Sequence, residues 1–210
     1  FGLYLRHASR SVLMHIINAI KTGDVNEAPR LEAMLSHTIQ SNKEREMAYV
    51  RQATHDALTG CKNRRAFDSD IAELLNAQQP FAMALVDIDN FKSINDTLGH
   101  LTGDIVLRNV AREGIQIMQP HHVSVYRYGG EEFAVIFQAE QMSSALSLLE
   151  AWRTAVEKRV WREENLRVTF SGGLGEWHFE PLEQFVGSVD NALYSAKQQG
   201  KNRIVRTSIS

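Results

Sequence analysis

Acidic residues are gathered at two points of this sequence. Asp87 and Asp89 close the apolar run at 81–86, and Glu131 and Glu132 follow a pair of glycines. Carboxylates held at one point repel one another unless cations join them, and hard oxygen ligands of this kind suit Mg²⁺ or Mn²⁺, with phosphates and water completing the coordination. The pattern favours a metal site that binds a nucleoside triphosphate, against the alternative that these acids are solvated turn residues.

A polar, glycine-punctuated segment at 91–104 follows the first acidic pair. An aspartate can accept hydrogen bonds from the N1–H and the exocyclic amine of guanine, and an asparagine amide can serve the remaining groups of the base. Asn95 and Asp104 are therefore candidates for reading a guanine edge. Helix caps use the same residue types, so both interpretations stay open at this point.

Gly129 and Gly130 come directly before the second acidic pair. Two adjacent glycines can supply the positive φ angles of a two-residue hairpin turn, which predicts a hairpin between strands at 123–128 and 133–137. Glycines also let a phosphate or a base approach the backbone, because they have no Cβ atom.

The elements that would position these residues follow from hydrophobic periodicity. Predicted strands lie at 81–86, 123–128, 133–137, 166–174 and 204–205, and predicted helices at 64–76, 102–118, 143–160 and 182–199. The order βαββαβ predicts an α+β, ferredoxin-like domain, one antiparallel sheet with helices on one face, here with added helices and an edge strand. The first and third strands are neighbours in that topology, so Asp87 and Glu131 are predicted to lie close together.

The first 55 residues have a different character. Apolar residues recur at helical spacing on both sides of the segment Thr22-Gly23-Asp24, which would end one helix, and Pro29 suits the first turn of the next. We therefore expect an α-helical hairpin or stalk over 1–55 and a catalytic domain over 56–210.

Composition sets outer limits on function. Of the 210 residues 43% are hydrophobic, which is typical of a folded protein. The formal net charge of −2 argues against a protein that binds duplex nucleic acid through a basic surface. The single cysteine, Cys61, excludes a disulfide within the chain and favours the cytoplasm. No apolar run reaches the roughly 18 residues of a membrane span, so this segment is expected to make no membrane contact. Because the chain begins with Phe1, we expect an upstream sensor region.

The segment Arg127-Tyr-Gly-Gly-Glu-Glu-Phe133 resembles the signature of the GGDEF domain of diguanylate cyclases, in its GGEEF form. Further blocks are similar to that family at 56–65, 87–92, 95–104 and 190–203, so the resemblance covers about 55–206. It implies a fold of the nucleotidyl-cyclase and polymerase-palm type. It also implies that two GTP molecules, one on each subunit of a homodimer, are condensed to the second messenger cyclic di-GMP with release of two pyrophosphates.

The resemblance implies roles for individual residues as well. Asp87, the carbonyl of Ile88 and Glu131 would hold metal ions, Mg²⁺ or Mn²⁺, two in each active site. Either Glu131 or Glu132 would accept the proton of the attacking hydroxyl, and Glu131 is favoured. Asn95 and Asp104 would read guanine, with His100 near the nucleoside. The triphosphate would be met by Lys92, Lys197, Lys201, Gly129 and Gly130, with Lys92 counted among the catalytic residues.

The chain departs from the family pattern at Lys201 and in the four-residue segment 120–123. Lys201 stands where an arginine is more usual, so a bidentate phosphate contact becomes a point-charge contact. Many members also carry an Arg-x-x-Asp product-inhibition motif, and this chain has Pro120, His121, His122 and Val123 at those positions. The resemblance therefore implies an active enzyme without that product-inhibition site.

Two other functions remain as alternatives. The first is a catalytically inactive GGDEF-like module that binds nucleotide and relays a signal, against which the intact signature argues. The second is a cyclase or polymerase-like enzyme that uses ATP, against which Asn95 and Asp104 argue. For the active enzyme, the helical segment 1–55 would pair two catalytic domains and regulate them.

Overall fold

The computed structural model describes residue 14 and residues 28–207, and the chain divides into two compact units, 1–53 and 54–210. In the first unit, helix α2 spans Ala28–Thr54 with Pro29 in its first turn, so the helix predicted after Gly23 is confirmed. The helix predicted before Gly23 lies outside the described residues. No described helix is both long and apolar enough to cross a membrane.

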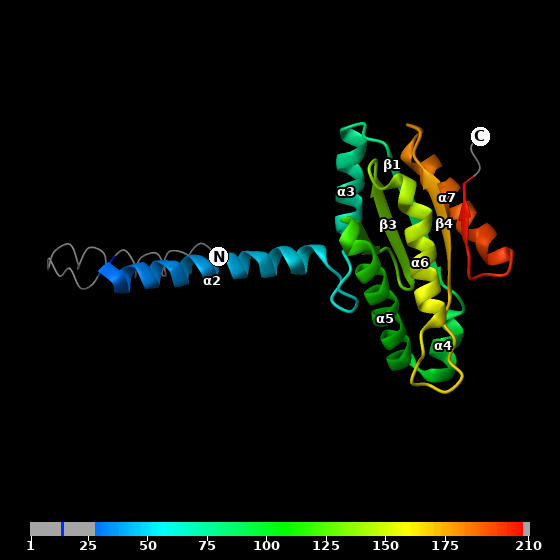
Figure 1. The fold of residues 1–210 in the computed structure, drawn as a ribbon, viewed down its shortest axis with the longest axis horizontal. Coiled ribbons are helices and arrows are strands. Elements are labelled where there is room, and N and C mark those ends of the chain that lie inside the picture. The colour runs from blue at the N-terminus through cyan, green and yellow to red at the C-terminus, as the bar shows by residue number, and fades with distance from the viewer. Residues whose placement is uncertain (1–13, 15–27, 208–210) are drawn as a thin grey trace. The chain divides into compact units, whose positions relative to one another are not determined.

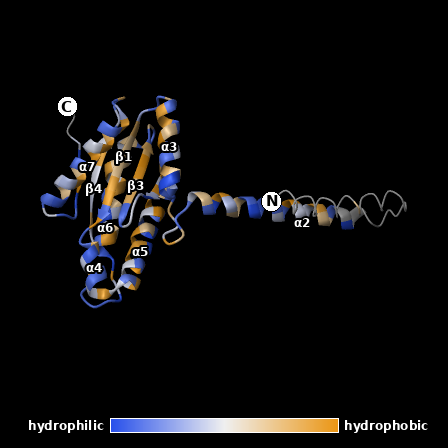
Figure 2. Cartoon of the chain, turned by 180° about the vertical axis from the view of Figure 1, so that it is seen from behind, coloured by the Kyte–Doolittle hydropathy of each residue, from blue (hydrophilic) through white to orange (hydrophobic). Residues whose placement is uncertain are grey.

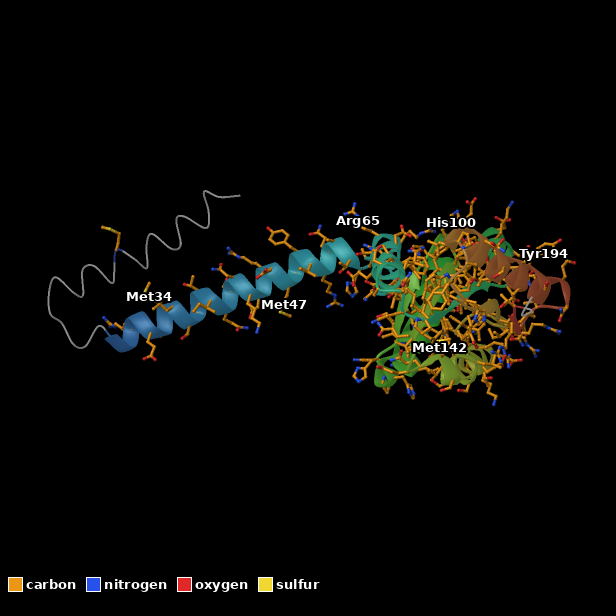
Figure 3. The ribbon with its side chains drawn as sticks, turned by 90° about the horizontal axis from the view of Figure 1, so that it is seen from above. Met34, Met47, Arg65, His100, Met142 and Tyr194 are labelled. Atoms are coloured by element: carbon orange, nitrogen blue, oxygen red, sulfur yellow. The ribbon has the colours of Figure 1, made fainter. Side chains whose placement is uncertain are left out.

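Helix α2 exposes apolar side chains along its length. Met34, Leu35, Ile39 and Met47 are between 37% and 65% exposed, and Figure 3 shows Met34 and Met47 projecting from the helix. Exposed apolar side chains repeated along one helix are typical of a surface that packs against another helix.

The second unit is built on a mixed five-stranded sheet in the order β2-β3-β1-β4-β5 (Figure 1). Strand β1 pairs antiparallel with β3 and with β4, β2 pairs antiparallel with β3, and β4 pairs parallel with β5. The predicted βαββαβ order is therefore confirmed, but the sheet is not wholly antiparallel as predicted, because the edge strand β5 pairs parallel with β4. Its elements are β1 (Phe81–Ile88), α5 (His100–Met118), β2 (Ser124–Arg127), β3 (Glu132–Gln138), α6 (Ala145–Lys158) and β4 (Phe170–Glu176).

Additional elements complete the domain. They are the helices α3 (Arg64–Asn76), α4 (Phe91–Leu98) and α7 (Leu182–Gln198), the edge strand β5 (Ile204–Arg206), and the short 3₁₀ turns η2 (Gln119–His121) and η3 (Met142–Ser144). Helices α5 and α6 cover one face of the sheet, as expected, and α3 and α7 cover the other.

Alternation along β1 shows why both faces need helices. Ala82, Ala84 and Val86 pack with residues of α5 and α6, whereas Phe81 and Met83 pack with residues of α3 and α7. A strand buried on both faces is apolar at every position, which is the pattern of 81–86. Figure 2 shows β1 and β3 in hydrophobic colours between the surrounding helices.

Two local predictions were wrong. The strand predicted at 166–174 is Phe170–Glu176, because its ladder with β1 ends at the pair Ile88–Phe170. One further bond, from the Asp89 N–H to the Thr169 carbonyl at 2.9 Å, does not extend the strand. The two-residue glycine turn is also absent. The last β2–β3 pair joins Arg127 to Phe133, and neither Gly129 nor Gly130 has a positive φ, so the connection is a longer loop.

Candidate active site at the ends of β1 and β3

The structure brings the two acidic pairs together. Asp87 lies opposite Glu132 in the β1–β3 ladder, and the Ile88 N–H donates to the Glu131 carbonyl at 3.4 Å. Burial raises the pKa of Asp87, and the negative charges of Glu131 and Asp89 add to this while Lys197 opposes it. Burial and the charge of Asp87 likewise raise the pKa of Glu132. Neighbouring carboxylates repel one another when they are ionised, and a bound cation would relieve that repulsion.

Lys197 reaches this acidic cluster from α7. Its Nζ lies 3.0 Å from Oδ1 of Asp87, whose side chain is only 14% exposed. Helix α7 can approach the sheet this closely because β4 carries glycine at the contact. A Cβ on Gly173 would lie 2.2 Å from the carbonyl oxygen of Val189. The glycine thus lets the α7 backbone pack directly on the strand.

Asp89 serves a structural purpose. Its carboxylate is 4% exposed and accepts hydrogen bonds from Thr169 Oγ1 at 2.7 Å, Ser171 Oγ at 2.7 Å and the Asn202 N–H at 3.1 Å. These bonds tie the loop after β1 to β4 and to the loop before β5. Asp87 is therefore the acid of this pair that is available for a ligand.

The connection between β2 and β3, residues 128–131, is called the glycine-acid loop here, and it is held by Arg127, a residue to which sequence reasoning gave no role. The guanidinium donates to both carboxylate oxygens of Asp56, at 3.0 and 3.2 Å, and to the Gly130 carbonyl, at 2.9 and 3.2 Å. Burial opposes ionisation of Asp56, but hydrogen bonds from Thr59 and Arg127 hold its pKa below the ordinary value. The turn at 56–60 is thus fastened to the loop that carries Glu131.

The two glycines of the loop differ in their surroundings. A Cβ on Gly129 would lie 2.6 Å from Oε2 of Glu132, so the missing side chain leaves room for that carboxylate. A Cβ on Gly130 would meet nothing within 4 Å. Gly130 is exposed, so its backbone is open to an approaching phosphate.

Asn95 and Asp104 lie on neighbouring helices, α4 and α5, and neither is a cap. Asn95 is inside α4, Asp104 is inside α5, and the N-cap of α5 is Gly99, with no side-chain capping bond. Both side chains are half-buried, and neither forms a hydrogen bond with another residue in the described part of the chain. Their polar groups are therefore available to a ligand.

The other predicted side chains are placed as follows. His100 begins α5 and is exposed, as its position at the surface in Figure 3 also shows, and Lys92 is exposed in the first turn of α4. Lys201 donates to Asn90 Oδ1 at 2.5 Å from a backbone with a φ of 64°. At the positions of the product-inhibition motif, Pro120 and His121 lie in turn η2, His122 is exposed with a φ of 57°, and Val123 is buried in the core.

The donors around Asp87 fit a hard divalent cation. The described residues contain no group of three or more histidine, cysteine, aspartate or glutamate side chains arranged to hold a metal. A cation at Asp87 and Glu131 would therefore need backbone, water or phosphate oxygens to complete its coordination. Mg²⁺ is usually bound in this way, by one or two carboxylates together with substrate phosphates.

Comparison with curated proteins shows the same family throughout. The family model of the diguanylate cyclase GGDEF domain matches residues 53–203. Diguanylate cyclase VdcA of Vibrio cholerae is 37% identical over 169 residues, which are 78% of this chain and 50% of VdcA. Diguanylate cyclase DgcZ of Escherichia coli is 33% identical over 177 residues, 82% of this chain and 60% of DgcZ. This chain spans about half the length of the curated relatives it matches.

Solved structures agree with this assignment. The coiled coil and GGDEF domain of DgcB from Caulobacter crescentus, in complex with c-di-GMP, has a TM-score of 0.71 and 32% identity, covering 86% of this chain and 100% of that one. The active GGEEF domain of a diguanylate cyclase from Vibrio cholerae has a TM-score of 0.64 and 31% identity, covering 71% of this chain and 99% of that one. The chain belongs to the diguanylate cyclase family of GGDEF domains.

Proposed function

We propose that this chain condenses two GTP molecules into cyclic di-GMP and releases two pyrophosphates. The observation that carries the proposal is the convergence of Asp87, Glu131, Glu132 and Lys197 at one end of the sheet. The second support is the pair of polar side chains on α4 and α5, Asn95 and Asp104, whose groups no other described residue occupies.

Asp87, the Ile88 carbonyl and Glu131 would hold Mg²⁺ or Mn²⁺, two ions in each site. When bound, the metal supplies charge stabilisation at the reacting phosphate. Lys197, which pairs with Asp87, would neutralise triphosphate charge, together with Lys92 and Lys201. Either Glu131 or Glu132 would accept the proton of the 3′-hydroxyl, and Glu131 is favoured as an acceptor that the metal polarises.

Each domain of this kind would hold one nucleotide, so ring closure needs a second copy of the chain. The 3′-hydroxyl of each GTP attacks the α-phosphorus of the other, and most of the rate gain comes from positioning the two. We propose that residues 1–55 pair two catalytic domains and regulate their approach, and that 56–210 forms the catalytic domain.

The proposal is tested by incubating the purified chain with GTP and Mg²⁺ and separating the nucleotides by chromatography. Formation of cyclic di-GMP from GTP, with ATP left unconverted, is the expected result. Binding of GTP without turnover would favour the alternative of an inactive nucleotide-binding relay. Conversion of ATP at a comparable rate would contradict the assignment of Asn95 and Asp104 to guanine.

Replacement of Asp104 by alanine is expected to raise the KM for GTP by about 10- to 150-fold. A hydrogen bond to a charged acceptor contributes roughly 1.5–3 kcal/mol, and each 1.4 kcal/mol is about tenfold in affinity. Steady-state kinetics over a wide range of GTP concentration measures the change. Asp68→Ala is the matched control, since Asp68 is an exposed acid paired with Arg64 on α3. An unchanged KM in Asp104→Ala would remove Asp104 from the base site.

Cyclic di-GMP is expected to inhibit this chain only weakly, by competition at the active site. The product-inhibition motif binds guanine through charge-assisted hydrogen bonds of its arginine and aspartate. Pro120 and Val123 stand at those two positions here and cannot form such bonds, and Val123 is buried. Initial rates at saturating GTP with increasing cyclic di-GMP measure the effect. Strong inhibition that additional GTP does not relieve would reveal an allosteric product site elsewhere on the chain.

A further inference from the structure

Helices α4 and α5 approach each other most closely at Gly103. A Cβ on Gly103 would lie 2.0 Å from Oδ1 of Asn95, 3.0 Å from its Cγ and 3.2 Å from Cζ of Phe91. A Cβ atom essentially never comes within 3.0 Å of a heavy atom of a residue that is not its chain neighbour, so an added methyl group would have to displace the Asn95 side chain. The Asn95 side chain therefore lies in a space that exists only because residue 103 has no side chain.

The backbone at Gly103 gives no other reason for glycine. The residue lies inside α5 and has no positive φ, so alanine could adopt its conformation. Alanine at an interior helix position is favoured over glycine by about 1 kcal/mol. The position therefore forgoes helix stability, and the side chain that gains from this is Asn95.

Packing, and not hydrogen bonding, holds the Asn95 side chain in place. Its neighbours Phe91 and Ile94 are buried and anchor α4 to the core, while its own side chain is half-buried and makes no hydrogen bond with the described residues. The next residue of α5 after Gly103 is Asp104, the other candidate for the base. One glycine thus sets how close the Asn95 amide lies to the helix turn that carries Asp104.

We infer that Gly103 is a positioning residue for guanine recognition, since its missing side chain leaves the space in which the Asn95 amide is held beside Asp104. The inference rests on the proposed function, because it assumes that Asn95 contacts the base. Gly103 itself need not touch the nucleotide. The consequence is that a single methyl group on α5 should weaken the selection of guanine over adenine while leaving the reacting groups at β1 and β3 in place.

The test is a double-mutant cycle between Gly103→Ala and Asn95→Ala. Equilibrium dissociation constants of GDP and ADP are measured in the presence of Mg²⁺, together with KM and kcat for GTP. We expect Gly103→Ala to raise the KM for GTP and to lower the ratio of the ADP and GDP dissociation constants, each by about tenfold, which is the loss of one hydrogen bond. The value of kcat at saturating GTP should change much less.

One control variant and the double variant of the cycle make the result specific. Gly187→Ala is the matched control, because Gly187 is also a helical glycine and a Cβ there would meet nothing within 4 Å. It should leave selectivity and KM unchanged. In the Asn95→Ala background the contact no longer exists, so adding Gly103→Ala should have no further effect on selectivity. If Gly103→Ala alone is poorly folded, the double variant should recover the melting temperature of Asn95→Ala.

The outcomes separate this inference from the function on which it rests. Equal weakening of GDP and ADP by Gly103→Ala, or a full effect that persists without the Asn95 side chain, would mean that Gly103 acts only through helix packing, and the inference would fail. Wild-type selectivity in Gly103→Ala would overturn it too. Wild-type selectivity in Asn95→Ala would instead contradict the assignment of Asn95 to the base, and with it this part of the proposed function.

Discussion

Replacement of Asp87 by asparagine is expected to abolish formation of cyclic di-GMP while the protein remains folded. An amide has almost the same shape as the carboxylate, but it cannot balance the charge of a bound cation. Charge stabilisation by a metal ion is worth several kcal/mol in the transition state, which corresponds to a loss of about 1000-fold in rate. The change also removes the ion pair with Lys197. Initial rates at saturating GTP and Mg²⁺ measure the loss, and Glu131→Gln should behave in the same way.

Asp89→Asn provides the contrasting variant. Asp89 is buried and accepts hydrogen bonds from Thr169, Ser171 and the Asn202 backbone, so its replacement should lower the melting temperature. Asp87→Asn should lose turnover without a comparable loss of melting temperature. Titration with Mn²⁺, followed by its paramagnetic signal, gives a readout that does not depend on turnover. Wild-type rates in Asp87→Asn, or unchanged Mn²⁺ binding, would remove Asp87 from the metal site.

The sequence predicted the topology of the catalytic domain because its strands are marked by continuous apolar runs. The run at 81–86 is buried on both faces of the sheet, and the runs on either side of Gly129 pair as a hairpin. Strand order then requires β1 to lie beside β3, which places Asp87 near Glu131. The meeting of the two acidic pairs was therefore predictable from strand character and strand order alone.

What periodicity could not predict are contacts between loops far apart in the chain. Arg127 reaches Asp56, and Asp89 reaches Asn202, through loop conformations that no hydrophobic pattern records. The ion pair of Lys197 with Asp87 depends on how closely α7 approaches the sheet, which Gly173 determines. A glycine in a strand indicates that another backbone approaches closely, so Gly173 is the sequence feature from which the close packing of α7 could be predicted.

The glycine-acid loop shows the same limit at short range. A glycine pair between two strands favours a tight turn with positive φ angles, yet here Gly129 makes room for Glu132 and the loop is held from outside by Arg127. The residue types are those of a tight turn, but the conformation of the loop is set by the Glu132 side chain and by Arg127, which also pairs with Asp56. Local propensity was overridden by tertiary contacts at the position where the proposed chemistry takes place.

Deletion of residues 1–53 is expected to leave a folded catalytic domain that binds GTP but turns over slowly at low concentration. The cut falls at the boundary between the two compact units and keeps Asp56, which Arg127 needs. The second unit has its own hydrophobic core on both faces of the sheet, which supports independent folding. Without the α2 contact, two loaded domains would meet only by collision.

The readout is specific activity as a function of protein concentration. For the truncated chain it should rise about linearly with concentration while the protein is monomeric, because the active species is a dimer formed by mass action. The longer chain should hold a constant specific activity to much greater dilution. If the exposed apolar side chains of α2 form the contact, Ile39→Asp in the longer chain should make its specific activity depend on concentration, as in the truncated chain. Gln40→Glu changes an exposed polar position and should leave the specific activity constant. Equal specific activity of the two chains, at dilutions where the truncated one is monomeric by light scattering, would exclude α2 from the mechanism.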